Sequence, residues 1–207
     1  MGEIFRILSE FYKFPEIGFY EALQQREIWC ELAEAMQKHG FSSDVFDELQ
    51  EHIMFASYED MKRAYCLTFI SIGRTAAVPV ESVYKVWTTD RSSGMSFADS
   101  KGYLMGDSAL HVRYMLERLQ IELPEELSKQ PDHISVLLEL LGYFVDQRGV
   151  QETRQFLRDH FDWLADFKAQ IQQVHGHKLY LHITQVIIDI VEALQQTMAA
   201  EEQSNLG

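Results

Sequence analysis

Residues that make turns and cross-links are scarce in this chain of 207 residues, which has 11 glycines, 4 prolines and 2 cysteines. So few glycines and prolines argue against a fold built on many tight turns. Cys30 and Cys66 lack a paired CxxC spacing, which argues against a disulfide framework and a structural zinc site. Both cysteines lie in apolar helical patterns, so we expect buried, unreactive thiols.

Basic residues are also few. The chain has 18 lysines and arginines against 32 aspartates and glutamates, which gives a formal net charge of −14. Such a chain repels the phosphates of nucleic acids and attracts a basic peptide. No apolar run approaches the length of a membrane span, and the N-terminus lacks the basic region, apolar run and cleavage site of a signal peptide. We therefore expect a cytoplasmic protein.

Signature motifs of common enzyme classes are absent as well. The chain contains no GxxxxGK[ST], GxGxxG, HExxH or GxSxG pattern. His175, His177 and His182 form the strongest metal candidate, but no cysteine or acidic residue completes a ligand set within that stretch. We interpret them as surface histidines at a helix break, and we expect neither a metal nor a cofactor.

Apolar residues recur at helical spacing through most of the chain. This periodicity predicts helices over about 3–12, 27–39, 42–53, 58–72, 103–119, 132–147, 151–163 and 178–198. The segment 132–147 is apolar around most of its girth, so it should be central. The prediction is one all-α domain over residues 1–200, a bundle of roughly nine or ten helices, followed by a disordered tail at 201–207.

A long central loop interrupts this pattern between Ser71 and Gly102. Loops of such length are uncommon in compact domains unless they serve a function or are mobile. We expect mobility in its polar part, residues 90–100. The part from Val78 to Val86 could form a short strand, although Pro79 argues against a central one. The loop could also act as a hinge for domain swapping, so we expect a monomer or a domain-swapped dimer.

Polar residues that helix packing does not require gather in two short stretches, 73–84 and 131–134. Glu81 lies in an apolar run, where a carboxylate needs solvent or a partner, and a guanidinium would suit it. Asp132 could be the N-cap of the helix that follows, where it would accept an amide hydrogen bond from the first turn. His133 would then be neutral and donate a hydrogen bond to the loop. Tyr84 and Trp87 could be core aromatics.

The order of these motifs resembles a known family. Val78-Pro79-x-Glu81-Ser82-Val83-Tyr84 is followed by Pro131-Asp132-His133-Ile134 and then by Phe156-Leu157-x-x-His160-x-x-Trp163. Over residues 3–194 this is similar to the TorD/DmsD/NarJ family of molybdoenzyme maturation chaperones. Val80 and Gln130 depart from residues that are common in that family.

The resemblance implies an all-helical cytoplasmic chaperone without catalytic activity of its own. Such a protein binds the twin-arginine signal peptide, or a related N-terminal segment, of a molybdopterin-dependent oxidoreductase of the DMSO or TMAO reductase type. It holds that catalytic subunit until the cofactor is inserted. The resemblance implies peptide contacts at Pro79, Glu81, Ser82, Tyr84, Asp132 and His133.

An acidic helical bundle can offer carboxylates and an apolar groove to a signal peptide, which has a basic head and an apolar stretch. We therefore hypothesise that Glu81 and Asp132 meet the arginines, and that an apolar groove receives the rest of the peptide. The residues expected to line that groove are Tyr84, Trp87, Leu137 and Leu141.

Three other interpretations stay open. The chain could be an assembly chaperone of a membrane-bound nitrate reductase, which binds a vestigial N-terminal segment. It could be a small helical metal-dependent hydrolase that uses Asp132, His133, His175 and His177. It could also be a generic adaptor for a partner helix, which would not prefer paired arginines to paired lysines.

Overall fold

A computed structural model describes residues 1–43, 46, 55–70 and 75–205 of the chain, and every extended regular element in this part is a helix. The all-α prediction is confirmed. The helices are α1 (Gly2–Glu10), α2 (Ile17–Gln24), α3 (Glu27–Lys38), α5 (Tyr58–Phe69), α6 (Glu81–Tyr84), α7 (Asp107–Leu119), α8 (Ile134–Gln147), α9 (Val150–His160), α10 (Leu164–Gln173) and α11 (Lys178–Asn205). Within the described residues, no helix is both long and apolar enough to cross a membrane.

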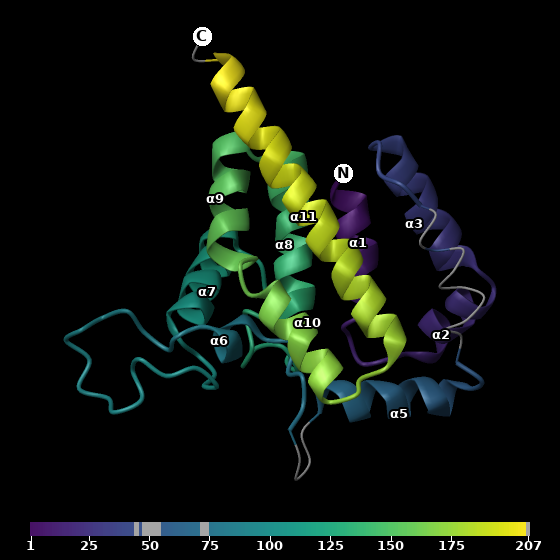
Figure 1. Cartoon of the computed structure of the whole chain (residues 1–207), viewed down its shortest axis with the longest axis horizontal. Coiled ribbons are helices and arrows are strands. Elements are labelled where there is room, and N and C mark those ends of the chain that lie inside the picture. The colour runs from purple at the N-terminus through teal and green to yellow at the C-terminus, as the bar shows by residue number, and fades with distance from the viewer. Residues whose placement is uncertain (44–45, 47–54, 71–74, 206–207) are drawn as a thin grey trace.

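Helix α8 lies in the middle of the bundle, as its apolar composition predicts (Figure 1). It contacts α1 on one side and α9 on another, while the long helix α11 runs diagonally across the bundle and contacts α9 and α10. Leu137, Leu138 and Leu141 are fully buried on α8, and Phe5 and Leu8 are fully buried on α1. Each such side chain contributes about 1.5–3 kcal/mol through removal of apolar surface from water.

Two glycines allow α1 and α8 to approach closely. A Cβ atom added at Gly142 would lie 2.9 Å from the backbone oxygen of Gly2, which is closer than real Cβ contacts allow. The amide of Gly2 donates a hydrogen bond of 2.9 Å to Oδ1 of Asp146, one turn farther along α8. Because neither glycine has a side chain, the backbones of α1 and α8 can lie this close together.

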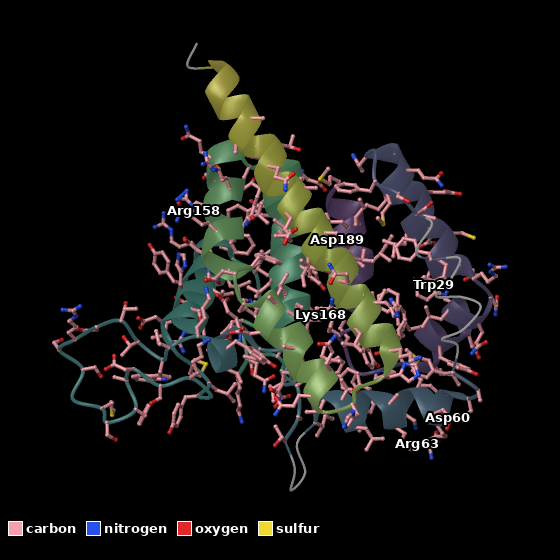
Figure 2. The ribbon with its side chains drawn as sticks, viewed as in Figure 1. Trp29, Asp60, Arg63, Arg158, Lys168 and Asp189 are labelled. Carbon is pink, nitrogen blue, oxygen red and sulfur yellow. The ribbon has the colours of Figure 1, made fainter. Side chains whose placement is uncertain are left out.

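Helices α2, α3 and α5 form the other side of the molecule (Figure 1). Trp29 of α3 is 2% exposed and packs against Phe11 and Phe46, between α3 and the rest of the bundle (Figure 2). The predicted helix over 42–53 lies almost entirely outside the described residues.

Several predicted boundaries are wrong. Helices α2 and α10 are separate elements that the periodicity did not predict, because each is short. Helix α11 continues to Asn205, so the predicted start of a disordered tail at Glu201 lies inside a helix; residues 201–203 are all good helix formers. The expectation of buried cysteines is also wrong, since Cys30 is exposed and Cys66 is half-buried.

Candidate functional site

The two motif stretches, far apart in sequence, lie against each other. Val80 and His133 form an isolated antiparallel β-bridge, and the amide of Ile134 donates to the backbone oxygen of Pro79 at 2.9 Å. The amide of Glu81 donates to the backbone oxygen of Asp132 at 3.1 Å. These backbone hydrogen bonds therefore hold the first residues of α6 beside the first residues of α8. The possible strand over 78–86 is replaced by this single bridge and the short helix α6.

Asp132 caps α6 instead of its own helix. Its Oδ2 accepts the amide hydrogen bond of Ser82, in the first turn of α6, at 2.7 Å. The interpretation of Asp132 as the N-cap of the following helix is therefore wrong, although capping is its observed contact. The side chain is fully buried, and its Oδ1 has no hydrogen-bond partner among the described residues. Burial raises the pKa of Asp132, the hydrogen bonds from Ser82 lower it, and the nearby charge of Glu81 raises it.

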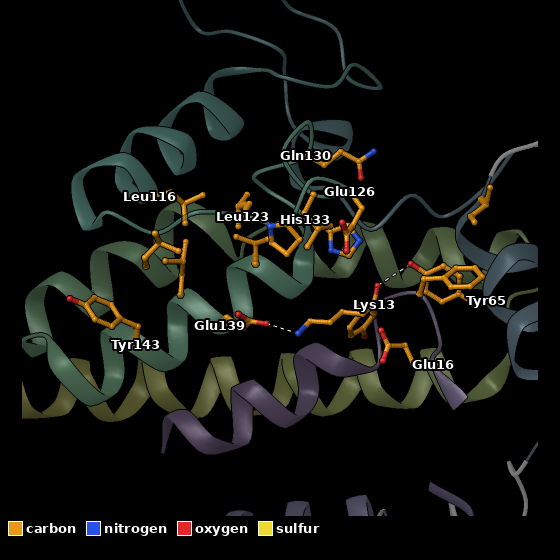
Figure 3. A pocket seen from close by; sticks show the side chains of 18 residues that line it. Lys13, Glu16, Tyr65, Leu116, Leu123, Glu126, Gln130, His133, Glu139 and Tyr143 are labelled. Carbon is orange, nitrogen blue, oxygen red and sulfur yellow. Dashed lines mark hydrogen bonds and ion pairs between the residues drawn. The ribbon is translucent and has the colours of Figure 1, made fainter. Parts of the chain in front are cut away.

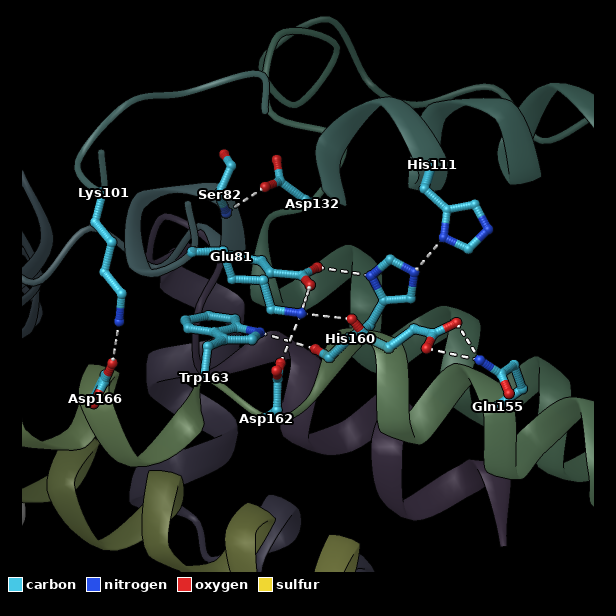
Figure 4. A network of polar contacts seen from close by, with 12 residues as sticks. Glu81, Ser82, Lys101, His111, Asp132, Gln155, His160, Asp162, Trp163 and Asp166 are labelled. Carbon is cyan, nitrogen blue, oxygen red and sulfur yellow. Dashed lines mark hydrogen bonds and ion pairs between the residues drawn. The ribbon is translucent and has the colours of Figure 1, made fainter. Parts of the chain in front are cut away.

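Glu81 is also fully buried, and its carboxylate has partners inside the protein (Figure 4). Its Oε1 lies 2.9 Å from Nζ of Lys85, and its Oε2 lies 2.8 Å from Nδ1 of His160. Lys85 in turn pairs with Asp162 at 2.6 Å. Burial lowers the pKa of Lys85, but the paired carboxylates of Glu81 and Asp162 outweigh it and raise that pKa.

The hydrogen-bonded chain continues from Glu81 through His160 to His111 on α7. Nε2 of His160 lies 3.0 Å from Nδ1 of His111, and the two rings are stacked with centroids 5.0 Å apart. Burial, and then the neighbouring His160, lower the pKa of His111. The sequence motif included His160, but neither its role nor that of His111 was predicted. The Glu81-x-x-x-Lys85 spacing, one helical turn, was the available signal for the lysine.

Tyr84 and Trp87 occupy different environments. Tyr84 is buried, stacks on Trp163 with ring centroids 5.2 Å apart, and contacts Phe167 edge-on. Its hydroxyl has no hydrogen-bond partner among the described residues, and burial raises its pKa. Trp87 is half-buried in the following loop, where it packs against Phe97. Tyr84 therefore takes the position of a core aromatic, the alternative that the sequence left open.

His133, and not Asp132, is the N-cap of α8. Its Nδ1 accepts the amide hydrogen bond of Ser135 at 3.2 Å and lies 2.7 Å from the Ser135 hydroxyl oxygen. The side chain is 4% exposed. Burial, and then the charge of Lys13, lower the pKa of His133 to about 4. His133 is therefore neutral at physiological pH, as expected.

His133 also lines a cavity of about 770 Å³. The cavity lies between α8, the segment that follows α1, helices α5 and α7, and the segment that connects α7 to α8 (Figure 3). The side chains around it are Tyr12, Lys13, Phe14, Glu16, Tyr65, Ile70, Leu116, Ile121, Leu123, Pro124, Glu126, Leu127, Gln130, His133, Val136, Glu139, Leu140 and Tyr143. We call it the α1/α8 groove.

The α1/α8 groove differs in chemistry along its length. Lys13, Glu16 and Glu126 lie toward one end, whereas Leu116 and Tyr143 lie toward the other (Figure 3). Three carboxylates and one ammonium line it, so its charge is negative. Nζ of Lys13 is 2.7 Å from Oε1 of Glu139 and 2.6 Å from Oε1 of Glu10. Glu16 and Glu126 are exposed and have no ion-pair partner among the described residues.

Most of the residues predicted to bind a peptide do not line this groove. Leu137 and Leu141 are fully buried in the core of α8, and the next residues around the helix, Val136 and Leu140, face the groove instead. Glu81 and Asp132 are buried and reach neither solvent nor the groove. In this conformation Glu81 and Asp132 are not accessible to incoming arginines, so their pairing with arginines stays a prediction. Of the nine predicted residues, only His133 lines the groove.

A second cavity, of about 670 Å³, lies on the other side of the motif pair, near α6, α7, α9 and α10. Tyr84, His111 and His160 line it, together with the aspartates Asp159 and Asp162. Charges of both signs are mixed around this cavity. It lacks the long apolar wall of the α1/α8 groove.

The metal-hydrolase interpretation gains no support. His177 stacks on Phe55 with ring centroids 4.5 Å apart, and its Nδ1 accepts the amide hydrogen bond of Leu179. In the described part of the chain, no three histidine, cysteine, aspartate or glutamate side chains gather closely enough to hold a metal ion.

Comparison with known proteins identifies the family. The family model described as nitrate reductase delta subunit matches residues 41–173. The chaperone protein TorD of Shewanella piezotolerans is 24% identical over 185 residues, which cover 87% of this chain and 82% of that protein. A Haemophilus influenzae protein named "Probable Tat proofreading chaperone DmsD" is 27% identical over 103 residues, which cover 49% of this chain and 50% of that protein.

A solved structure shows the same fold. It is the crystal structure of a protein from Archaeoglobus fulgidus that is assigned as a redox enzyme maturation protein. It superimposes with a TM-score of 0.55 at 18% identity and covers 96% of this chain and 94% of that one. The family model spans more than half of this chain. The chain therefore belongs to the nitrate reductase delta subunit family, the TorD/DmsD/NarJ family of molybdoenzyme maturation chaperones.

Proposed function

We propose that this chain is a cytoplasmic chaperone that binds the N-terminal signal segment of a molybdenum oxidoreductase in the α1/α8 groove, and that it has no catalytic activity of its own. The observation that carries the proposal is the polarity of the groove: carboxylates gather toward one end and an apolar wall extends toward the other. A twin-arginine signal peptide has the matching order of a basic head and an apolar stretch. The net charge of −14 favours the same partner.

Family membership supports the peptide class. The named relatives are TorD and a Tat proofreading chaperone, and Tat signals carry the paired arginines. In the groove, Glu126 and Glu139 would receive the arginines, because a guanidinium pairs with a carboxylate through two parallel hydrogen bonds. Leu116, Leu140 and Tyr143 would cover the apolar stretch.

Calorimetric titration tests the proposal. The ligands are twin-arginine signal peptides of candidate oxidoreductases and matched versions in which two lysines replace the arginines. We expect micromolar or tighter binding that weakens with the lysine version, because lysine lacks the planar donor fork of arginine. No binding by either peptide would overturn the proposal.

A pair of charge variants locates the site. Glu126→Gln with Glu139→Gln should weaken binding about three- to tenfold and reduce its salt dependence, because exposed ion pairs are each worth up to about 1 kcal/mol. Glu31→Gln with Glu34→Gln is the matched control, since both glutamates are exposed on α3 and outside the groove. An equal loss in both double variants would show that only the net charge matters.

The nitrate reductase delta subunit match favours a second candidate, an assembly chaperone for a membrane-bound nitrate reductase. Its client segment would enter the same groove without a requirement for two arginines. The titration separates the two candidates: binding of a nitrate reductase N-terminal segment, and of no export signal, would favour the second.

A further inference from the structure

Helix α7 packs on the bundle with one side and leaves an apolar stripe on its other side. Leu110 is 42% exposed and Tyr114 is 57% exposed. These two side chains are one helical turn apart, so they lie on the same outer face of α7. Exposed apolar side chains that gather on one face of a helix favour contact with another molecule.

A cavity of about 350 Å³ lies beside this face, between α7 and α9. Met115 of α7, Phe144 of α8 and Phe156 of α9 line it. The rings of Phe144 and Phe156 are stacked with centroids 4.6 Å apart, so neighbouring aromatic rings hold this wall in place. The volume is at the lower end of the range of about 300–1,000 Å³ found for ligand pockets, which suits one bulky side chain of a partner.

His111 holds the start of α7 against the end of α9. Its Nδ1 lies 3.0 Å from Nε2 of His160, and Nδ1 of His160 lies 2.8 Å from the buried carboxylate of Glu81. These contacts already fix the two helices on either side of the cavity. A partner therefore binds without first having to order the walls, which lowers the entropic cost of association.

Two arginines stand at opposite ends of the cavity. Arg158 of α9 (Figure 2) precedes His160 by two residues, so it lies at the end near His111. Arg118 lies two turns farther along α7, where its guanidinium is 6.0 Å from the centroid of the Tyr114 ring. Both arginines are exposed, and neither forms an ion pair with a residue that the structure describes.

The carboxylates near the cavity are already occupied or offset. Glu152 accepts a backbone amide at 3.3 Å, and Asp159 accepts the side-chain amide of Gln155 at 2.7 Å. Glu117 is exposed on α7 one turn after Arg113, so these two opposite charges offset each other. The charge left for a ligand is therefore positive, in a chain whose net charge is −14. This is the opposite of the negative α1/α8 groove, so the two sites suit different partners.

We infer that the cavity between α7 and α9 docks an acidic amphipathic helix of a protein partner, which is not the basic signal segment. One bulky apolar side chain of that helix fills the cavity, and a carboxylate on each side of it pairs with Arg118 or Arg158 through two parallel hydrogen bonds. The arginines are separated by about two helical turns, roughly 10 Å along α7. The two carboxylates should therefore be about seven residues apart, with the apolar side chain between them.

Panning of random peptides displayed on phage against the full chain tests the inference without a known partner. We expect enrichment of acidic peptides that carry a bulky apolar residue between two carboxylates at this spacing. A fluorescent copy of the enriched sequence should bind Arg118→Ala with Arg158→Ala about tenfold more weakly than the natural chain, because two ion pairs are lost. The matched control is Arg91→Ala with Lys38→Ala, which removes the same charge from exposed positions outside α7 and α9.

Fluorescence anisotropy measures these affinities, and alanine in place of the bulky residue of the peptide should also weaken binding. An equal loss of affinity in the control variant would show that only the net charge matters and would overturn the inference. Enrichment of basic peptides alone, with binding that Glu126→Gln with Glu139→Gln reduces, would overturn it and leave the α1/α8 groove as the peptide site. Failure to enrich any peptide would overturn it as well.

Discussion

The carboxylate of Asp132 accepts the backbone amide of Ser82 at 2.7 Å across a separation of 50 positions in sequence. This hydrogen bond joins the start of α6 to the start of α8, and the backbone bonds from Glu81 and Ile134 lie beside it. The two motifs therefore form one structural joint between the α1/α8 groove and the second cavity. The joint places His133 in the wall of the groove and keeps Glu81 and Asp132 inside the protein.

Two substitutions at Asp132 separate its role as a hydrogen-bond acceptor from its negative charge. Asp132→Ala should lower the free energy of unfolding by about 1–3 kcal/mol, because the amide of Ser82 loses its buried acceptor. Asp132→Asn keeps an acceptor and removes a buried charge, so its stability should stay closer to that of the natural chain. Urea denaturation measures both variants. A loss in Asp132→Asn as large as in Asp132→Ala would show that the negative charge itself stabilises the joint.

Replacement of Glu81 should affect folding and leave peptide recognition intact. Glu81→Gln leaves Lys85 and His160 without their buried anionic partner, and we expect a loss of about 3 kcal/mol. The folded fraction should bind the signal peptide with nearly natural affinity, because Glu81 does not line the groove. Denaturation and calorimetric titration on the same preparation test this. Lost affinity in a fully folded sample would restore Glu81 as an arginine contact.

The stability of the protein should decline in mild acid because of His133. The pKa of His133 is about 4 in the folded protein and about 6.5 in an unfolded chain, so the unfolded state binds a proton first as the pH falls. The stabilisation is complete above pH 6.5 and is lost progressively toward pH 4, by ~3 kcal/mol in total.

The variant His133→Asn isolates this contribution. Asp132 acts in the opposite direction, since its raised pKa favours the folded state in acid, but Asp132 is present in both chains. The natural chain should therefore lose more stability than His133→Asn between pH 7 and pH 4, as measured by urea denaturation. Parallel pH curves would contradict a neutral, buried His133.

Lys13 should compete with the peptide for Glu139. Its ammonium already pairs with Glu139 and Glu10, so a client arginine must displace it. Lys13→Met should raise the affinity for a basic peptide severalfold. Lys62→Met is the control with the same change of net charge, because Lys62 pairs with Glu59 on α5 and does not line the groove. Equal gains in both variants would contradict specific competition.

The contact between α1 and α8 should not tolerate a larger residue. Gly142→Ala would place a Cβ atom 2.9 Å from the backbone oxygen of Gly2, and we expect a loss of about 1–3 kcal/mol. Gly18→Ala on α2 is the control: nothing lies within 4 Å of its Cβ position, so the higher helix propensity of alanine should stabilise the protein by about 0.5–1 kcal/mol. Thermal or urea denaturation that ranks the two variants in the opposite order would contradict the close packing.

The sequence predicts the fold better than it predicts the site. The central position of α8 follows from its apolar girth, and the two loops stand out because helix packing does not require their polar residues. The orientation of those residues could not be read from the sequence. Glu81 looks available to a ligand, but its partners include His160, which is 79 positions away.

The sequence also does not show which face of α8 lines the groove. A helix that is apolar around most of its girth gives little signal that separates the core positions Leu137 and Leu141 from the groove positions Val136 and Leu140. The segment connecting α7 to α8, which supplies Glu126 to the groove, has no periodicity that would place it there. Both placements depend on contacts between segments that are distant in sequence.

Photo-crosslinking tests most directly where the peptide binds. A signal peptide with benzoylphenylalanine in its apolar stretch is bound to the natural chain and irradiated, and mass spectrometry identifies the crosslinked residues. Binding in the α1/α8 groove predicts crosslinks at Leu116, Leu140 and Tyr143. Crosslinks at Lys101, Arg158 and Trp163 would place the peptide in the second cavity and contradict the account.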